Sequence, residues 1–267
     1  MGGLGLVGAV LATLIIKNPE RGRFDRPKTE NEILLAEAKK PAKGKKPKGF
    51  KEFIKQMADI NKNPVCKNIF MAGFLRTLSS MIVTTFVPVF FQRVFPAFKS
   101  EYAVINAAAL TIFGFSSALI GGILSDRFGK KSYMTNSAII MTGHFIAVPL
   151  TAIACFTNNF WLAISCFAAK IFFSGSYFAP AITMMQNSSD PSDSGFVVSA
   201  YTFYAHIAQT IAPLIFGFFA NYFGAVGNPR VYGYLVTAAV TMGYLGSNVF
   251  YYKAGKEYKN MMEARNK

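Results

Sequence analysis

The chain has 267 residues, of which 52% are hydrophobic and 15% are charged, and it contains 27 phenylalanines. Its apolar residues gather in runs of about 20, the length that a helix needs to cross a hydrocarbon core of ~30 Å. This pattern excludes an ordinary soluble domain. Backbone polar groups in lipid must be satisfied within their own segment, and the sequence has no alternating barrel pattern. We therefore expect an all-α integral membrane protein.

The formal charge of +15 could indicate nucleic-acid binding, but its distribution indicates membrane topology. Of the 28 lysines and arginines, 23 lie in the segment 17–67, in the turn 127–131 and in the tail from residue 253 onward. Short loops rich in Lys and Arg stay on the cytoplasmic side of a membrane. We therefore expect no nucleic-acid partner, and membrane lipid with anionic headgroups as the partner of the basic connector.

The sequence gives no sign of catalytic or metal chemistry. Cys66, Cys155 and Cys166 lie at or within apolar runs without metal-ligand spacing, which is typical of small buried residues rather than of a disulfide framework. No nucleotide-phosphate loop and no nucleophile–base pair is visible in the sequence. We expect no cofactor, no metal and no catalytic residue, and hence no enzyme.

In chain order, Met1–Ile16 is an apolar segment followed at once by Lys17, the reverse of the charge order of a signal peptide. We expect a complete or truncated helix whose C-terminal end is cytoplasmic. The polar connector that follows ends in Phe50–Ile60, where Phe53 and Met57 share an amphipathic face with Ile54. We expect a helix lying on the membrane surface, and a calmodulin-like or lipid-switch role is the alternative.

Six spans follow, joined by short outer connectors and basic or turn-rich inner ones. Gln186–Ser194 is an inner turn whose aspartates we expect to cap the fifth span. Gly175 and Pro180 make the fourth span bendable. The expected spans are Asn68–Phe91, Tyr102–Gly121, Ser132–Phe156, Phe160–Met185, Phe196–Phe223 and Val231–Tyr252.

The inner connector between the second and third spans is the segment Gly122–Lys131. We interpret it as a tight turn in which Gly121 and Gly122 allow close helix approach and Gly129 supplies backbone freedom. Asp126 can accept hydrogen bonds from the N-terminus of a neighbouring helix.

Eight positions of this turn resemble the loop signature G-x-L-[AS]-D-R-x-G-[RK]-[RK] of the major facilitator superfamily. The alternative is that any basic turn between two spans looks similar. The matching residues are Gly122, Leu124, Ser125, Asp126, Arg127, Gly129, Lys130 and Lys131.

In that family the signature follows the second helix of each six-helix half. The resemblance therefore implies the last helix of one half (residues 1–17), a basic cytoplasmic connector (18–65), a six-helix bundle (66–253) and a basic cytoplasmic tail (254–267). Residues Asn18–Gly22 resemble, more weakly, the exit from the sixth helix in spinster-like members, which handle sphingolipid-type solutes.

Members of the family move a solute by rocking two halves around a cavity at the membrane midplane. Arg76 and Lys170 are basic residues inside the first and fourth spans, the helices that line the cavity in the family. Ser174 and Tyr177 share the face of Lys170 by helical spacing. We expect all four in the substrate pathway, and the alternative is that each basic side chain snorkels to an interface or bonds backbone carbonyls.

The fifth span carries Thr202, His206, Gln209 and Pro213 on one face. His206 can carry a proton because its pKa lies near physiological pH. The alternative is that His206 bonds neighbouring helices while Pro213 bends the span. We expect His206 and Gln209 in the pathway, and a structural role for His144 on the third span.

Taken with the resemblance, these features imply a secondary active transporter of a small organic solute, anionic or lipid-like, present here as a partial chain. In the family, the carboxylate of the signature loop latches the cytoplasmic side, a role that falls here on Asp126 within the gate motif Gly122, Asp126, Arg127, Gly129, Lys130 and Lys131. The expected partners are the solute, membrane lipid and a missing N-terminal half or second membrane subunit. The competing reading is a half-length, non-transporting membrane partner.

Overall fold

The computed structural model describes residues 49–129, 132–190 and 193–265. The predicted helix at 1–17, most of the connector, and Lys130 and Lys131 of the signature lie outside these residues. The described residues form helices joined by turns, without strands, which confirms the all-α class. The elements are α3 (Phe50–Ile60), α4 (Pro64–Val94), the 3₁₀ turn η1 (Pro96–Phe98), α5 (Lys99–Phe128), α6 (Thr135–Phe156), α7 (Phe160–Gly175), α8 (Phe178–Ser188), α9 (Ser194–Tyr222) and α10 (Arg230–Arg265).

Five segments of the described chain are long and apolar enough to cross a membrane, and they match the first five predicted spans. The sixth predicted span, Val231–Tyr252, falls inside α10, which is helical but less apolar than the other five. The segments that meet the length and composition requirement are Pro64–Val94, Pro96–Phe128, Thr135–Phe156, Phe160–Ser188 and Ser194–Tyr222.

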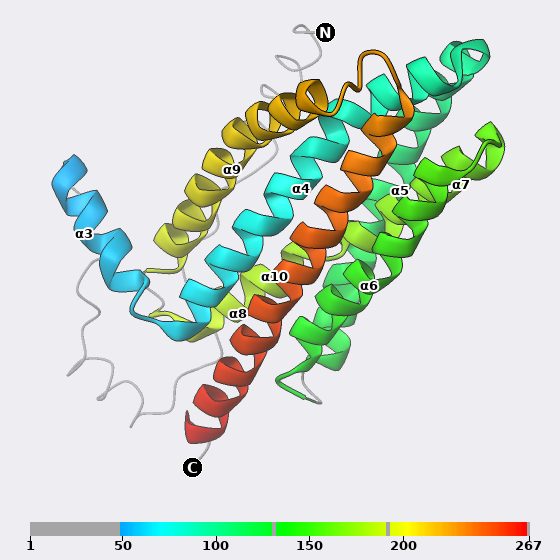
Figure 1. Cartoon of the computed structure of the whole chain (residues 1–267). Coiled ribbons are helices and arrows are strands. Elements are labelled where there is room, and N and C mark those ends of the chain that lie inside the picture. Colours follow the sequence, from blue (N-terminus) through cyan, green and yellow to red (C-terminus); the bar gives the residue numbers. More distant parts are fainter. Residues whose placement is uncertain (1–48, 130–131, 191–192, 266–267) are drawn as a thin grey trace, which may run out of the picture. The chain divides into compact units, whose positions relative to one another are not determined.

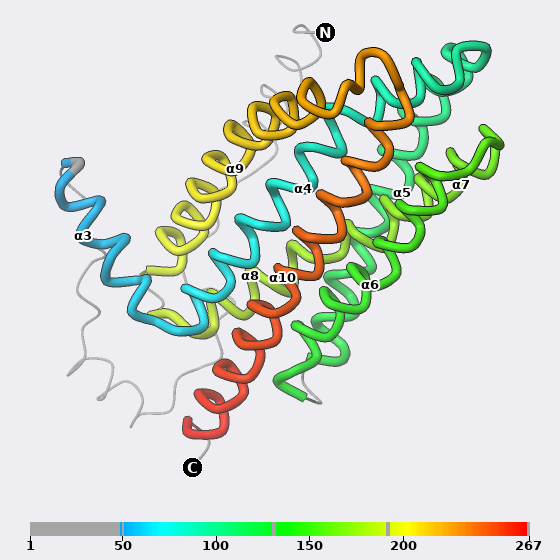
Figure 2. The backbone as a smooth tube through the Cα atoms, viewed as in Figure 1, coloured from blue at the N-terminus to red at the C-terminus, as the bar shows by residue number. Residues whose placement is uncertain are grey.

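The packing of the helices explains why α10 is less apolar. Helix α10 packs against both α4 and α6, α4 packs in turn against α9, and α7 packs against α5 and α6 (Figures 1 and 2). Side chains of α10 therefore meet protein along two faces, and there polar groups can be satisfied by neighbouring helices instead of facing lipid.

The predicted fourth span is divided into α7 and α8 by a break at Ser176 and Tyr177. Pro180 has no N–H to bond the carbonyl of Ser176, which removes a helical hydrogen bond at this position. The bend expected from Gly175 and Pro180 is confirmed.

Two asparagines begin helices as N-caps. The Asn63 side chain accepts a hydrogen bond from the backbone N–H of Val65 at 2.9 Å, and Asn159 does the same for Trp161 at 2.9 Å. Asp193 stands at the N-cap position of α9 but makes no side-chain capping bond, so the predicted capping of the fifth span by these aspartates is wrong for Asp193.

The signature segment differs from the predicted tight turn because α5 continues as helix through Phe128. Gly129 has ordinary right-handed helical angles, so backbone freedom is not what this position requires. Close approach is confirmed at Gly121, where an added Cβ would lie 2.7 Å from the Ser176 carbonyl oxygen. Gly122 is less crowded, since the nearest atom to its added Cβ is the Ala179 Cβ at 4.0 Å.

Helix α3 turns its apolar face toward α9, and its position on a membrane surface stays a prediction. The Phe53 ring lies 5.4 Å from the Phe196 ring and 5.8 Å from the Phe203 ring, both on α9. The Asn61 amide donates to the Tyr204 hydroxyl at 2.9 Å. The apolar face of α3 thus packs on the bundle, and Ile54, on its flank, remains exposed.

Candidate functional site

A polar layer lies between two apolar clusters of the bundle. One cluster lies toward the Val94 end of α4 and includes residues of α6, α7 and α10. The other lies toward the Pro64 end of α4 and includes residues of α8, α9 and α10. The residues between them include buried polar side chains that belong to four different helices: Arg76, Ser79, His144, Lys170, Ser174, Ser247 and Asn248. Polar groups at this depth are costly unless they meet partners or a ligand, so this layer is the candidate site.

Arg76 joins α4 to the broken helix α7–α8. Its Nη2 donates to the Ser174 carbonyl oxygen at 3.0 Å, and its guanidinium carbon lies 3.1 Å from the centre of the Tyr177 ring. The contact with Tyr177 is a cation–π interaction. The Nε of Arg76 is buried and has no hydrogen-bond partner in the described chain.

Lys170 is also buried, one helix away on α7. Its Nζ lies 5.6 Å from the centre of the Tyr244 ring and 5.8 Å from that of Phe167. Snorkelling is excluded for the observed positions, because Arg76 and Lys170 are 6% and 4% exposed. Neither forms an ion pair with a carboxylate among the described residues.

Both cations line one cavity of about 180 Å³ between α4, α5 and α7. The cavity also receives Ser174 and, from α5, Tyr102 and Asn106. The structure therefore brings Arg76, Lys170 and Ser174 together around one space. The remaining lining residues are Ser80, Val83, Thr84, Pro88, Leu110, Gly114, Phe167, Ile171 and Gly175.

A second cavity of about 280 Å³ lies on the other side of Arg76, between α4, α8 and α9. Tyr177, Tyr201, Thr202 and Gln209 line this cavity. Because Arg76 lines both cavities, it separates a space that holds Lys170 from a space that holds Tyr177 and Gln209.

His206 and the gate residues are placed apart from the two cavities. His206 is exposed on α9, where its Nδ1 lies 3.3 Å from Gln209 Oε1. Asp126 and Arg127 are exposed near the end of α5, and Asp126 has no hydrogen bond to the N-terminus of a neighbouring helix within the described ranges. Their functional roles remain predictions.

His144 has a buried structural setting between α6 and α10, as expected. Its Nδ1 lies 2.7 Å from Asn248 Oδ1 and 3.3 Å from Ser247 Oγ, and its ring stacks on Tyr244 at 4.5 Å. Its Nε2 is buried without a partner among the described residues.

Sequence reasoning missed the contribution of α10 to this layer. Tyr244, Ser247, Asn248 and Tyr251 recur at spacings of three and four and therefore share one face of the helix. All four are buried, and the hydroxyls of Tyr244 and Tyr251 have no partner in the described chain. This spacing of polar residues on one helical face could have predicted from the sequence that α10 contributes to the polar layer.

The unpartnered groups at this site are chiefly hydrogen-bond donors. The Arg76 Nε–H, the Asn248 amide and the tyrosine hydroxyls can all donate, and the two cations add positive charge. A ligand that brings negative charge and acceptor oxygens would meet these groups, and a cationic ligand would be repelled. The fold and this layer together define a multi-pass α-helical membrane protein with a cationic cavity inside its bundle.

The chain belongs to the Major Facilitator Superfamily, whose family model matches residues 1–213 and 69–257. This confirms the resemblance carried by the signature turn. The chain is 26% identical over 172 residues to the "Multi-drug resistance efflux pump PmrA" of Streptococcus pneumoniae serotype 4, with the same figures for the pump of strain R6. These matches cover 63% of the chain and 41% of each pump.

A solved structure shares the fold of the chain. The chain aligns with the crystal structure of a bacterial homologue of the human lysosomal transporter Spinster, in an inward-facing and unoccupied conformation. The TM-score is 0.57 at 17% identity, over 96% of this chain and 58% of that chain. This likeness supports the fold of one half of such a protein, and the chain spans less than two thirds of the length of these relatives.

Proposed function

We propose that the chain forms the substrate-binding half of a secondary active transporter whose solute is a small organic anion. The observation that carries the proposal is the shared cavity of Arg76 and Lys170, two buried cations without a carboxylate partner in the described chain. Membership of the superfamily supports transport, and the similarity of the chain to multidrug efflux pumps fits a small organic solute.

The apolar surroundings of the two cations favour a solute with an apolar body. Residues such as Val83, Leu110, Phe167 and Ile171 line the same cavity as the two cations. Burial of an apolar body gains about 25 cal/mol per Å² removed from water. An amphiphilic or lipid-like anion satisfies both features of the cavity.

A binding experiment tests the charge preference. The chain is reconstituted in lipid nanodiscs, and the binding of 2-naphthoate is compared with that of 2-naphthylmethylammonium, which has the same ring system and opposite charge. We expect 2-naphthoate to bind the natural chain and the Arg76→Gln variant to bind it at least tenfold more weakly, equivalent to about 1.4 kcal/mol. Equal binding of both probes, or unchanged binding in Arg76→Gln, contradicts the proposal.

Matched substitutions at exposed positions serve as controls. Arg93→Gln makes the same substitution on α4 at an exposed position, and Lys99→Gln is the exposed counterpart of Lys170→Gln. We expect both controls to bind 2-naphthoate as the natural chain does. Loss of binding in the controls would show that the overall charge of the protein, not the cavity, attracts the anion.

We also propose that Asp126 belongs to a cytoplasmic latch, with Gly122, Arg127, Gly129, Lys130 and Lys131 in the same motif. Asp126 is exposed at the end of α5, where a second half of a transporter can approach it. His206 and Gln209 on α9 are proposed to face the same solute pathway, with Gln209 already at the second cavity.

A second candidate function is a non-transporting membrane partner. Helices α5 and α9 carry many exposed apolar side chains, which another membrane protein or lipid would cover. Flux of 2-naphthoate into proteoliposomes containing the chain favours transport. Binding without flux, together with stable association with a second membrane protein, favours the partner role.

A further inference from the structure

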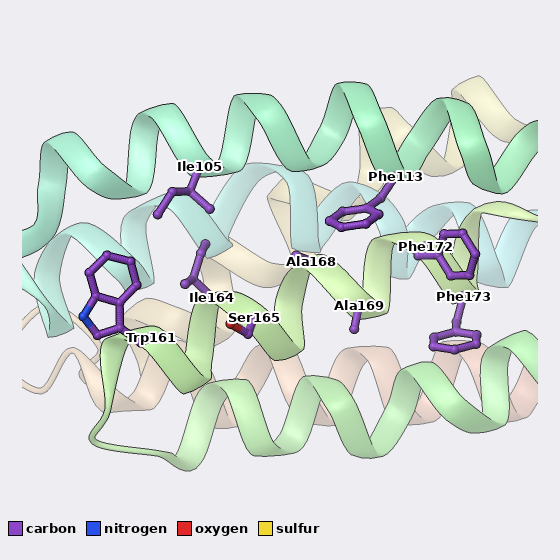
Figure 3. Close-up of a pocket in the computed structure, with 9 residues that line it drawn as sticks. All are labelled: Ile105, Phe113, Trp161, Ile164, Ser165, Ala168, Ala169, Phe172 and Phe173. Carbon is purple, nitrogen blue, oxygen red and sulfur yellow. The ribbon is translucent and has the colours of Figure 1, made fainter.

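An apolar groove of about 490 Å³ lies beside the candidate site, on a different part of α7. Figure 3 shows the side chains that line it, with Trp161 at one end and Phe172 and Phe173 at the other. Ile105 and Phe113 of α5 reach toward α7 along its edge (Figure 3). Its floor is made of small residues: Ser165, Ala168 and Ala169.

The groove is continuous with the surface that the bilayer covers. Both helices that form it belong to segments apolar and long enough to span a membrane. Trp161 and Phe113 line the groove while remaining 55% and 38% exposed, so the groove opens sideways from the bundle. An opening at this depth in a membrane-spanning helix pair faces hydrocarbon rather than water.

The length of the groove corresponds to one leaflet. From Trp161 to Phe173 the helix rises ~18 Å at 1.5 Å per residue. Half of a hydrocarbon core of ~30 Å is about 15 Å. Trp161 stands next to the loop Thr157–Asn159, at a level where tryptophan is favoured at the membrane interface. The groove therefore runs from an interface toward the bilayer centre.

The space within the groove is narrower than a helix. A volume of about 490 Å³ spread over ~18 Å gives a mean cross-section of roughly 27 Å². A helix of ~10 Å diameter needs roughly 80 Å². The space accommodates a single extended hydrocarbon chain. The side chains on its floor are too small to fill the groove themselves.

We propose that this α5–α7 groove is a binding site for one acyl chain of a membrane lipid, separate from the solute cavity. The chain would lie along α7, with Ala168 and Ala169 beneath it and the rings of Trp161, Phe113 and Phe172 at its sides. Such a lipid exchanges more slowly with the bilayer than the lipids around the rest of the protein. This inference does not depend on the identity of the transported solute.

The experiment uses Trp161, which is the only tryptophan of the chain. The protein is reconstituted in dioleoyl-phosphatidylcholine with increasing fractions of the same lipid brominated across its oleoyl double bonds, at carbons 9 and 10, and tryptophan emission is recorded. The reference is the Trp161→Phe/Tyr234→Trp variant. Tyr234 lies near the start of α10 with 53% exposure, against 55% for Trp161, but it does not line the groove.

If the groove retains an acyl chain, brominated lipid at a mole fraction near one tenth quenches Trp161 at least twice as strongly as the tryptophan at position 234. The excess should saturate as the fraction rises. Equal quenching of the two reporters at every fraction overturns the proposal, because no acyl chain is then held closer to Trp161 than to an ordinary exposed position. Weaker quenching at Trp161 also overturns it, since the groove is then covered by protein.

A variant that fills the groove tests whether the excess quenching of Trp161 arises there. Ala169→Phe places a ring on the groove floor and should reduce quenching of Trp161 to the level of the reference. Ala107→Phe adds the same ring at an exposed position of α5 that does not line the groove, and it should retain the excess. An excess that survives Ala169→Phe contradicts the assignment of the groove. If this variant fails to fold, the comparison of the two reporters still decides the question.

Discussion

Helices α4 and α10 are packed at the centre of the bundle, whereas α5 and α9 are the most exposed of its long helices. In the most apolar stretch of each helix, 44% of the residues are buried in α4 but 17% in α5 and 22% in α9. The central pair carries Arg76, Ser79, Ser247 and Asn248. The exposed pair carries apolar side chains such as Leu214 on its surface.

This contrast shows that burial in protein, not membrane depth alone, decides where polar residues can be placed. Polar groups on the exposed helices bond chiefly within their own helix, as Ser116 bonds the Ile112 carbonyl. On α10 a polar group can meet a neighbouring helix instead, as when Asn248 contacts His144. The central helices can therefore hold the binding chemistry, while the exposed helices present surfaces to lipid or to another half.

The largest expected effect comes from breaking the contact between α4 and α10. An added Cβ at Gly243 would lie 2.8 Å from Ser79 Cβ and 3.0 Å from the Leu75 carbonyl oxygen. We expect Gly243→Leu to lower the free energy of unfolding by about 1–3 kcal/mol or to prevent folding. Unfolding by SDS in mixed micelles measures the change. Gly217→Leu on α9 is the control, because nothing lies within 4 Å of its added Cβ. Equal losses of unfolding free energy in both variants would contradict the difference in packing between the central and the exposed helices.

The buried polar contacts between α6 and α10 should contribute next. Asn248→Ala removes the 2.7 Å partner of the His144 ring, and we expect a loss of about 1–3 kcal/mol in the same measurement. Ser116→Ala on exposed α5 removes a hydroxyl that bonds only its own helix, at the Ile112 carbonyl. We expect that control to stay within about 0.5 kcal/mol. A neutral Asn248→Ala would mean that the polar layer does not stabilise the central pair.

A smaller effect is expected at the start of α7, which follows the loop Thr157–Asn159. Asn159→Ala removes the side-chain cap from Trp161 and Leu162, and we expect a loss of about 1 kcal/mol. Asn159→Asp should restore most of it, because aspartate also caps helices. If the aspartate variant is as unstable as the alanine variant, the cap is not the cause.

The smallest effect on stability is expected at the C-terminal end of α5. Asp126 is exposed, so Asp126→Asn should change the free energy of unfolding by less than about 0.5 kcal/mol. If Asp126 belongs to a latch, the variant should open the cytoplasmic side and speed alkylation of Cys66, which is fully buried near the start of α4. Alkylation is followed in a Cys155→Ala/Cys166→Ala background. Unchanged uptake and unchanged alkylation would contradict the latch.

Five of the six predicted spans match segments that are long and apolar enough to cross a membrane, because long apolar runs have few alternatives there, and the sixth falls inside the less apolar α10. The family followed from eight positions of one turn, and the bend of the fourth span followed from Gly175 and Pro180. The boundaries were less accurate at Gly122–Lys131, where the apolar face and basic end of α5 are both compatible with a longer helix. The contact of α3 with α9 could not be predicted, because an amphipathic pattern does not distinguish a membrane surface from the side of another helix.

The sequence alone determined that this is a helical membrane protein with two unpaired basic residues inside its spans, since composition and run length are local properties. The tertiary structure decided which residues surround those two. The contact of Arg76 with Tyr177, the shared cavity with Lys170 and the polar stripe of α10 each join residues far apart in the chain. Such encounters depend on how helices are rotated and packed against one another, and helical periodicity within a single span does not specify that.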